Sequence, residues 1–523
     1  MSLSHVYNMT KSPHLYGSDA IKDVRKYLIN QIESMGLEYE IQSFERDILQ
    51  EHLQKHYEQI ANNPELAERR KNFAKKEGFD SFEDYYKHFF QGNTEYQNIL
   101  VKIGPQTPKY KFLMMAHYDS AKEGPGAGDD AVSVASLLEC MRILSLKKDM
   151  KNTVYFLITD GEESGLVGAD YFVKNPLFDP KEITLVTNFE ARGNKGVPLM
   201  FRSSENNKNL LKIISENIDK KWIFSWFNDI FKIMPNSTDL GIFINNGYKG
   251  LDFAMAQGSE NYHKASDNYE NLSVKSANQY LKTVTDLAKY FSSIDEIKTD
   301  SNENGLVFSF FNGKIIVLSN SFMKIFGIII SVLSIIFLIF AFIKKKYKIK
   351  DFLICMSAIL ISSSFALLLY FLQNQLIRIF SWLTLEIYGL IFISLISLLI
   401  MSLFILLVKK FFKIENISLK AVTILIFSIL SALSSLMFNS ASYIFSIPLL
   451  FILISALFEI FLKNSSLNLF FKSIEIFIFC MLFIPSIISL QIAIPYYIFA
   501  FYILCIIGSL PTISEMINLK LKN

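Results

Sequence analysis

Cysteine is scarce and scattered in this chain of 523 residues, which contains four. Cys140 is the one that lies before residue 300, and Cys355, Cys480 and Cys505 all lie in apolar runs. No CxxC pair occurs, so we expect neither a disulfide framework nor a cysteine-based zinc site. Any metal ligands should therefore be histidine and carboxylate side chains.

A charge of one sign is also lacking, because 52 basic residues nearly balance 49 acidic ones and the net charge is +3. No general attraction to nucleic acid follows, so we expect no nucleic-acid partner. Up to about residue 300 charged residues are spread evenly, but beyond Ser321 long apolar runs alternate with short lysine clusters. This shift predicts a soluble domain over 12–297, a linker over 298–321 and a transmembrane domain over 322–515 in a lipid bilayer.

The transmembrane domain contains about seven candidate spans, at 325–343, 352–372, 387–408, 421–437, 444–462, 474–490 and 494–510. Lysines gather after alternate spans, among them Lys344, Lys409, Lys420 and Lys472. The positive-inside rule then places these loops in the cytoplasm and the soluble domain on the other side. No signal peptide or anchor precedes Ser12 in this sequence, so this orientation requires a further N-terminal segment. We favour such a segment; the alternative is that the soluble domain faces the cytoplasm and that the lysine pattern is misleading.

Two glutamates, Glu459 and Glu475, lie in or beside the apolar runs. Charged residues within spans can mark a polar path. With so few of them, we expect instead that each lies near a helix end or is buried between helices.

The soluble domain alternates short apolar strands with amphipathic helices, which predicts an α/β fold with a mixed sheet flanked by helices on both faces. The opening helix, 19–35, has Ser18 as its N-cap and Gly36 as its stop signal. A polar, charge-rich stretch over about 45–96 reads as a helical insertion. The predicted strands are 37–44, 99–103, 112–116, 154–159, 185–189 and 251–256, and the later helices are 131–146, 165–173 and 273–293.

Polar residues follow two of these strands where loops leave the sheet, the usual place for a site. His117 follows the strand 112–116, and Asp119 is placed to accept the second ring N–H of that imidazole. Next comes a glycine-rich loop with Asp129 and Asp130. We expect Asp130 to cap the following helix, whereas Asp129 could point into the site and bridge two cations with its two oxygens.

Three later positions complete this set. Glu162 and Glu163 follow the strand 154–159, and there one carboxylate can bind a metal while its neighbour acts as general base. Glu190 ends the next strand, and His263 precedes the last soluble helix. His52 and His56 are four residues apart and could share a helix face, but the charges around them favour a solvated helix.

Five motifs occur in order: HYDS from residue 117, GAGDD from 126, TDGEESGLVGA from 159, NFEARG from 188 and YHKASD from 262. Together they resemble the co-catalytic di-zinc peptidase family of secreted bacterial leucine aminopeptidases and glutamate carboxypeptidase II, over residues 12–295. Secreted members usually carry aspartate where this chain has Glu190. The membrane-bound branch similar to endoplasmic reticulum metallopeptidase and fungal vacuolar membrane protease carries glutamate, and SPHLYGS from residue 12 and GYKGLDFA from 247 also resemble that branch.

The resemblance implies two zinc ions per chain. Asp129 would bridge them, His117 and Glu190 would complete one shell, and Glu163 and His263 the other. Glu162 would be the general base acting on a bridging water, and Asp119 would orient His117. The implied function is a membrane-bound zinc exopeptidase acting on peptides.

Aminopeptidase is our leading interpretation, although no residue here distinguishes it from carboxypeptidase. A one-zinc glutaminyl cyclase and a non-catalytic receptor or scaffold are the alternatives. Tyr248 and Tyr262 could assist the oxyanion but are better read as packing residues. Arg192 could meet a substrate carboxylate or equally form a salt bridge to the ligand shell.

Overall fold

The computed structural model describes residues 2–61, 63–90, 92–217, 222–233, 237–299, 301–309, 314–379, 386–461, 465–493 and 498–520. The chain divides into two compact units. The sheet unit comprises Met1–Ile223 and Ile230–Asn302, and the helical unit comprises Phe224–Asp229 and Glu303–Asn523.

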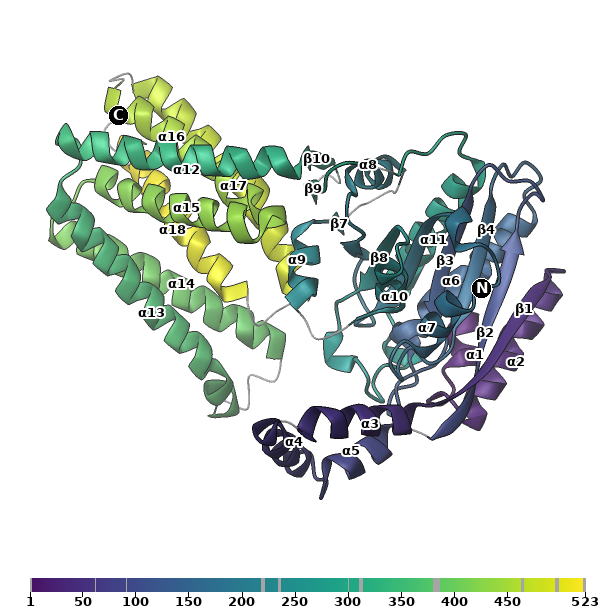
Figure 1. The fold of residues 1–523 in the computed structure, drawn as a ribbon. Helices are drawn as coiled ribbons and strands as arrows, with labels where there is room; N and C mark the ends of the chain where they lie inside the picture. Colours follow the sequence, from purple (N-terminus) through teal and green to yellow (C-terminus); the bar gives the residue numbers. More distant parts are fainter. Residues whose placement is uncertain are drawn as a thin grey trace. The chain divides into compact units, whose positions relative to one another are not determined.

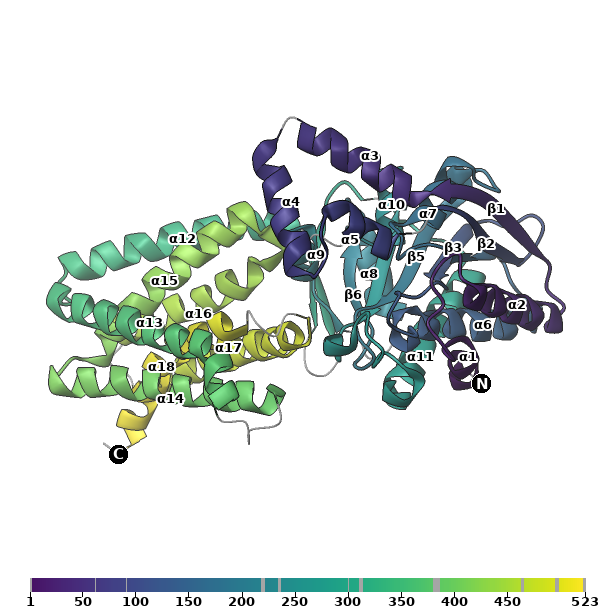
Figure 2. The ribbon, with the colours of Figure 1, turned by 90° about the horizontal axis from the view of Figure 1, so that it is seen from below.

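The sheet unit is built around an eight-stranded sheet among the described residues, in the order β1, β2, β4, β3, β5, β8, β6, β7 (Figures 1 and 2). The central strands β4, β3, β5 and β8 are parallel, whereas β1, β2 and β6 pair antiparallel with their inner neighbours. The predicted mixed sheet is therefore confirmed. The strands are β1 (Tyr39–Asp47), β2 (Asn93–Ile103), β3 (Lys111–His117), β4 (Thr153–Thr159), β5 (Ile183–Ala191), β6 (Leu199–Ser203), β7 (Trp222–Ile223) and β8 (Gly250–Met255).

Helices cover both faces of this sheet (Figure 1). Side chains alternate across a strand, so Leu113 and Met115 of β3 pack toward α7 and α10, whereas Phe112 stacks on Phe291 of α11 with ring centroids 4.5 Å apart. Ser18 caps α2 as predicted, accepting the N–H of Ile21. The helices are α1 (Ser2–Met9), α2 (Asp19–Ser34), α6 (Val132–Ser145), α7 (Val167–Lys174), α8 (Lys208–Asn217), α9 (Trp226–Ile233, shared between the units), α10 (Asp239–Asn245) and α11 (Val274–Ser293).

The predicted insertion lies between β1 and β2 as three helices, α3 (Ile48–Ala61), α4 (Pro64–Lys76) and α5 (Phe82–Phe89) (Figure 2). Its two ends meet, because Asp47 and Asn93 are paired across the antiparallel strands. His56 is buried, stacks on Phe82 and shares a 2.8 Å hydrogen bond with Arg70. The prediction of a solvated face is therefore wrong for His56, which is part of the insertion's own small core.

The helical unit begins, within the predicted linker, with an antiparallel pair of strands, β9 (Gly305–Ser309) and β10 (Ile315–Ser319). Five helical segments among the described residues are long and apolar enough to cross a membrane: Asn320–Ile343, Ile349–Leu368, Ser418–Met437, Tyr443–Phe461 and Ser466–Ile487. They agree with five predicted spans. The whole helices are α12 (Asn320–Ile343), α13 (Ile349–Ile379), α14 (Glu386–Phe411), α15 (Asn416–Met437), α16 (Tyr443–Phe461), α17 (Ser465–Ala493) and α18 (Ile498–Lys520).

The two other predicted spans fall partly outside the described residues. The span 387–408 coincides with α14, whose side chains are described from residue 396, and residues 494–497 of the last span are not described. Two lysines assigned to cytoplasmic loops are placed differently by the structure. Lys420 lies inside α15 and Lys472 inside α17, and both are buried. Their assignment to loops is therefore wrong.

Candidate metal centre

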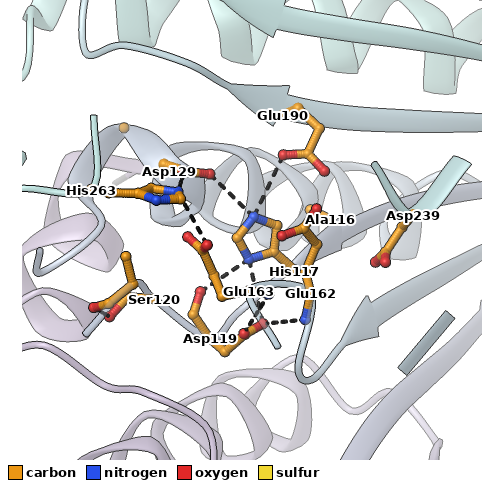
Figure 3. Close-up of polar contacts among 12 residues, drawn as sticks. Ala116, His117, Asp119, Ser120, Asp129, Glu162, Glu163, Glu190, Asp239 and His263 are labelled. Carbon is orange, nitrogen blue, oxygen red and sulfur yellow. Dashed lines mark hydrogen bonds and ion pairs between the residues drawn. The ribbon is translucent and has the colours of Figure 1, made fainter. Parts of the chain in front are cut away.

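The predicted site residues gather where the parallel strands end (Figure 3). His117 is the last residue of β3, and Glu190 lies near the end of the neighbouring β5. Glu162 and Glu163 follow β4, and His263 lies in the loop after β8. Because parallel strands present their carboxyl ends at one edge of the sheet, segments far apart in the sequence deliver their polar side chains to one place.

One group of candidate ligands surrounds the His117 imidazole. Its Nε2 lies 3.2 Å from Asp129 Oδ1 and 3.5 Å from Glu190 Oε2. On the other side of the ring, Nδ1 lies 3.0 Å from the backbone carbonyl of Asp119 and 3.4 Å from its carboxylate. An Nδ1–H directed at that carbonyl leaves the Nε2 lone pair free to face the carboxylates, which is the tautomer that a metal at Nε2 requires.

A second group surrounds His263. Its Nε2 lies 3.1 Å from Glu163 Oε2 and 3.3 Å from Asp129 Oδ2. Asp129 therefore points one carboxylate oxygen at each histidine (Figure 3). This is the bridging position that the sequence predicts for Asp129.

The donor set fits zinc. Ligand atoms around a tetrahedral Zn²⁺ at about 2.0–2.1 Å lie roughly 3.4 Å from one another, and the four histidine-to-carboxylate distances, 3.1, 3.2, 3.3 and 3.5 Å, surround that value. Glu163 Oε1 is buried without a hydrogen-bond partner among the described residues. Buried polar atoms seldom remain unpaired, so the site is built to receive cations.

The ionisation of the site residues agrees with this. Burial would raise the pKa of Asp129, but its hydrogen bonds with His117 and His263 outweigh burial and lower that pKa to about 2. Burial alone would lower the pKa of His263, but hydrogen bonds to Asp129 and Glu163 raise it to about 10. Burial raises the pKa of Glu163 to about 7 and that of Glu162 well above its ordinary value. Without metal the site therefore holds protons that a metal would displace.

Asp119 does more than the sequence predicts. Its Oδ1 and Oδ2 each accept a backbone N–H at 3.0 Å, from Glu162 and Glu163 respectively. The same residue thus faces His117 and fixes the loop that carries the predicted base and one candidate ligand. An aspartate between a metal-binding histidine and the adjacent loop couples the two in position.

Asp130 is the predicted site residue whose role the structure corrects. It does not cap α6, because both its oxygens are buried without a hydrogen-bond partner among the described residues and the helix follows Ala131. Its carboxylate instead groups with His117 and Glu190, within 4.8 Å of their ligand atoms. Asp130 therefore adds a further carboxylate to the five predicted ligand positions at this end of the sheet.

Three further residues support the site and were not assigned roles from the sequence. Asp267 accepts the backbone N–H groups of Gly128 at 2.9 Å and Asp129 at 3.1 Å. The Tyr280 hydroxyl bonds the backbone of the β5 ligand strand at 2.8 Å. Asp239, at the start of α10, is buried and accepts the Thr159 hydroxyl at 2.5 Å. The YHKASD motif contains Asp267, but no sequence signal singles out Tyr280 or Asp239.

The remaining candidates have packing environments. Tyr248 belongs to a buried hydrophobic cluster with α7 and α10, in agreement with the packing interpretation. Tyr262 stacks on the His263 imidazole, with centroids 3.7 Å apart, and Arg192 lies over the Tyr262 ring at 5.5 Å. The three form a stack that steadies a candidate ligand. His52 stacks on Phe90, and neither His52 nor His56 joins a metal-binding group among the described residues.

This arrangement can be compared with known proteins. Residues 98–288 match Peptidase family M28. The M28 segment contains every candidate ligand from His117 to His263, and the predicted resemblance to this peptidase family is confirmed.

The M28 segment is also the part shared with curated relatives. Vacuolar membrane protease of Candida dubliniensis is 28% identical over 309 residues, which cover 58% of this chain and 29% of that protein. Endoplasmic reticulum metallopeptidase 1 of Rattus norvegicus is 28% identical over 222 residues, covering 41% of this chain and 25% of that protein. The chain thus spans between a quarter and a third of the length of these relatives.

Two solved structures are similar to the same region. An aminopeptidase from Aneurinibacillus sp. strain AM-1 is 15% identical, covers 58% of this chain and 97% of its own, and has a TM-score of 0.43. A glutaminyl cyclase from Porphyromonas gingivalis is 17% identical, covers 55% and 96%, and has a TM-score of 0.40.

Proposed function

We propose that this chain is a membrane-bound zinc exopeptidase, with aminopeptidase as its leading activity, that binds two zinc ions in the sheet unit. The observation that carries the proposal is the position of Asp129, whose two oxygens face His117 and His263 at 3.2 and 3.3 Å. His117 and Glu190 would hold one ion, Glu163 and His263 the other, and Asp129 both. The five candidate spans support attachment to a lipid bilayer.

When bound, zinc supplies a Lewis acid that polarises the scissile carbonyl and acidifies a water molecule. Glu162 is partly buried beside the candidate ligands, and its backbone N–H is held by Asp119. A carboxylate in this position can accept a proton from the attacking water and then give it to the leaving amine. Asp119 holds the His117 ring in its ligating tautomer, and the stack of Arg192 and Tyr262 on His263 keeps the second imidazole in place.

The experiment is hydrolysis of a peptide library by the purified chain, with and without chelator, beside the variant Glu162→Gln. Loss of a general base costs roughly 10²–10⁴-fold in rate, so we expect activity to fall by that factor while zinc remains bound. Glu270→Gln changes an exposed glutamate and should stay fully active. Unchanged hydrolysis by Glu162→Gln would refute the assigned base.

Metal analysis tests the alternatives. Two zinc ions per chain support the peptidase, whereas one ion together with cyclisation of N-terminal glutamine would favour the glutaminyl cyclase. Peptides blocked at the amino or at the carboxyl end then separate the two exopeptidase classes. Zinc binding without any turnover would favour the receptor or scaffold.

A further inference from the structure

The helical unit contains a buried group of charged residues that the peptidase chemistry does not use. Five side chains from four helices meet: Lys420 of α15, Glu459 of α16, Lys472 and Glu475 of α17, and Glu515 of α18. Four of them are almost fully buried, and the Glu459 side chain is 17% exposed. We call this group the charge cluster.

Two glutamates of the charge cluster have close partners. Glu475 Oε2 lies 3.0 Å from the Lys420 ammonium, and Glu475 Oε1 accepts the Thr512 hydroxyl at 2.6 Å. Glu515 Oε2 lies 2.9 Å from the Lys472 ammonium. Each lysine is therefore already matched with one carboxylate.

Glu459 is the third carboxylate and has no close cation. Its Oε2 lies 3.8 Å from Lys420 and 3.7 Å from Lys472, and this buried oxygen makes no hydrogen bond among the described residues. Lys420 directs a hydrogen bond of 2.7 Å to Ser455 instead. Glu459 and Glu515 both face the Lys472 ammonium, at 3.7 and 2.9 Å, so that two ionised carboxylates would have to share this one cation.

The other nearby cation, Lys409 of α14, is only partly buried and donates to Ser514 at 3.0 Å. No additional buried cation lies beside Glu459 in the described part of the chain.

The charge cluster contains more carboxyl groups than ammonium groups. Two ammonium groups face three carboxyl groups in a nearly water-free site, and an unpaired buried charge costs several kcal/mol or is neutralised by a proton. We propose that Glu459 and Glu515 share one proton near neutral pH, so that this pair is a proton-binding site of the helical unit. Intramembrane carboxyl groups that gain and lose a proton are the working parts of proton relays.

The charge cluster lies near the ends of its helices. Lys420 and Lys472 lie near the beginnings of α15 and α17, whereas Glu459 and Glu515 lie near the ends of α16 and α18.

Infrared difference spectroscopy on the full-length chain in lipid nanodiscs tests the proposal. The spectrum of wild type minus Glu459→Gln should show the carbonyl stretch of one protonated carboxyl group, and this band should shift in heavy water. Protonated carboxyl groups of the sheet unit are present in both samples and cancel. The control Glu415→Gln alters a 66% exposed residue in a surface pair with Lys348 and should leave the spectrum unchanged.

The excess of carboxyl groups over ammonium groups predicts a second result. Removing a cation with Lys472→Met leaves two carboxyl groups without a partner, so the band should roughly double. Glu515→Gln should abolish the band as Glu459→Gln does. Monodisperse elution with unaltered helical circular dichroism establishes that each variant is folded. A folded Glu459→Gln without a difference band would mean that all three glutamates are ionised, as in a purely structural network or one that holds a metal cation, and would overturn the proposal. This test is independent of peptide hydrolysis.

Discussion

Asp267 should control metal affinity although it is not a candidate ligand. Its carboxylate accepts the backbone N–H of Gly128 at 2.9 Å and that of Asp129 at 3.1 Å, and so fixes the segment that carries the Asp129 carboxylate, the proposed bridge. In Asp267→Asn, one oxygen becomes an NH₂ group that faces a backbone donor. One charge-assisted hydrogen bond is lost, at a cost of about 1.5–3 kcal/mol.

This cost weakens zinc binding, because binding requires that Asp129 stay in the position where both histidines face it. A loss of about 1.5–3 kcal/mol corresponds to roughly 10- to 150-fold weaker zinc binding. Competition with a chromophoric chelator measures this affinity directly. Asp19→Asn, at a fully exposed position paired with Lys22, is the matched control and should bind zinc like the wild type. A folded Asp267→Asn with wild-type affinity would refute the idea that this carboxylate holds the bridging segment.

Three further outcomes are expected. Burial raises the pKa of Glu163 to about 7, so the folded metal-free chain retains a proton that the unfolded chain releases near pH 4. The contribution of this proton to the free energy of unfolding is fully present below about pH 4 and declines toward pH 7, by on the order of 1 kcal/mol per pH unit for such a carboxyl. A higher melting temperature of zinc-stripped protein at about pH 8 than at about pH 5 would contradict this expectation. In Gly128→Ala the added Cβ would lie 2.8 Å from a backbone carbonyl, and we expect a loss of about 1–3 kcal/mol in the free energy of unfolding, against almost none for Gly92→Ala, where the added Cβ would meet nothing nearer than the Asp47 carboxylate at 3.9 Å. Tyr280→Phe leaves a buried backbone N–H of β5 unpaired and should cost about 1–3 kcal/mol in chemical denaturation, whereas a loss no larger than that of the control Tyr290→Phe would refute a special role of the Tyr280 hydroxyl.

The central strands and the site they carry could be predicted because two simple patterns coincide. Apolar strands of the length of β3, β4 and β5 are followed at once by His117, Glu162 and the residues near them, and a parallel sheet brings such ends together. The proposed pairing of candidate ligands rests on the family resemblance that the order of the five motifs carries.

Interactions between distant residues could not be predicted in the same way. The contact of Asp267 with the Asp129 segment is made through backbone N–H groups, and such groups leave no side-chain pattern in the sequence. Lys420 resembles any lysine at the end of an apolar run, and its burial beside Glu475 depends on how α15 and α17 pack. Asp130 looks like a helix cap because it precedes α6, but the local backbone turns its carboxylate toward the ligands.

The order in which the ligands occur along the chain has a consequence for biosynthesis. No local segment contains a complete group, since His117 and Asp129 must wait for Glu190 on β5 and for His263 beyond β8. Parallel strands with long crossovers form slowly, because loop closure precedes their contacts. The emerging polypeptide therefore offers a metal ion only weak, incomplete chelation until most of the sheet has assembled. Metal capture should thus be a late event, by which time the ribosome is already translating the apolar helices.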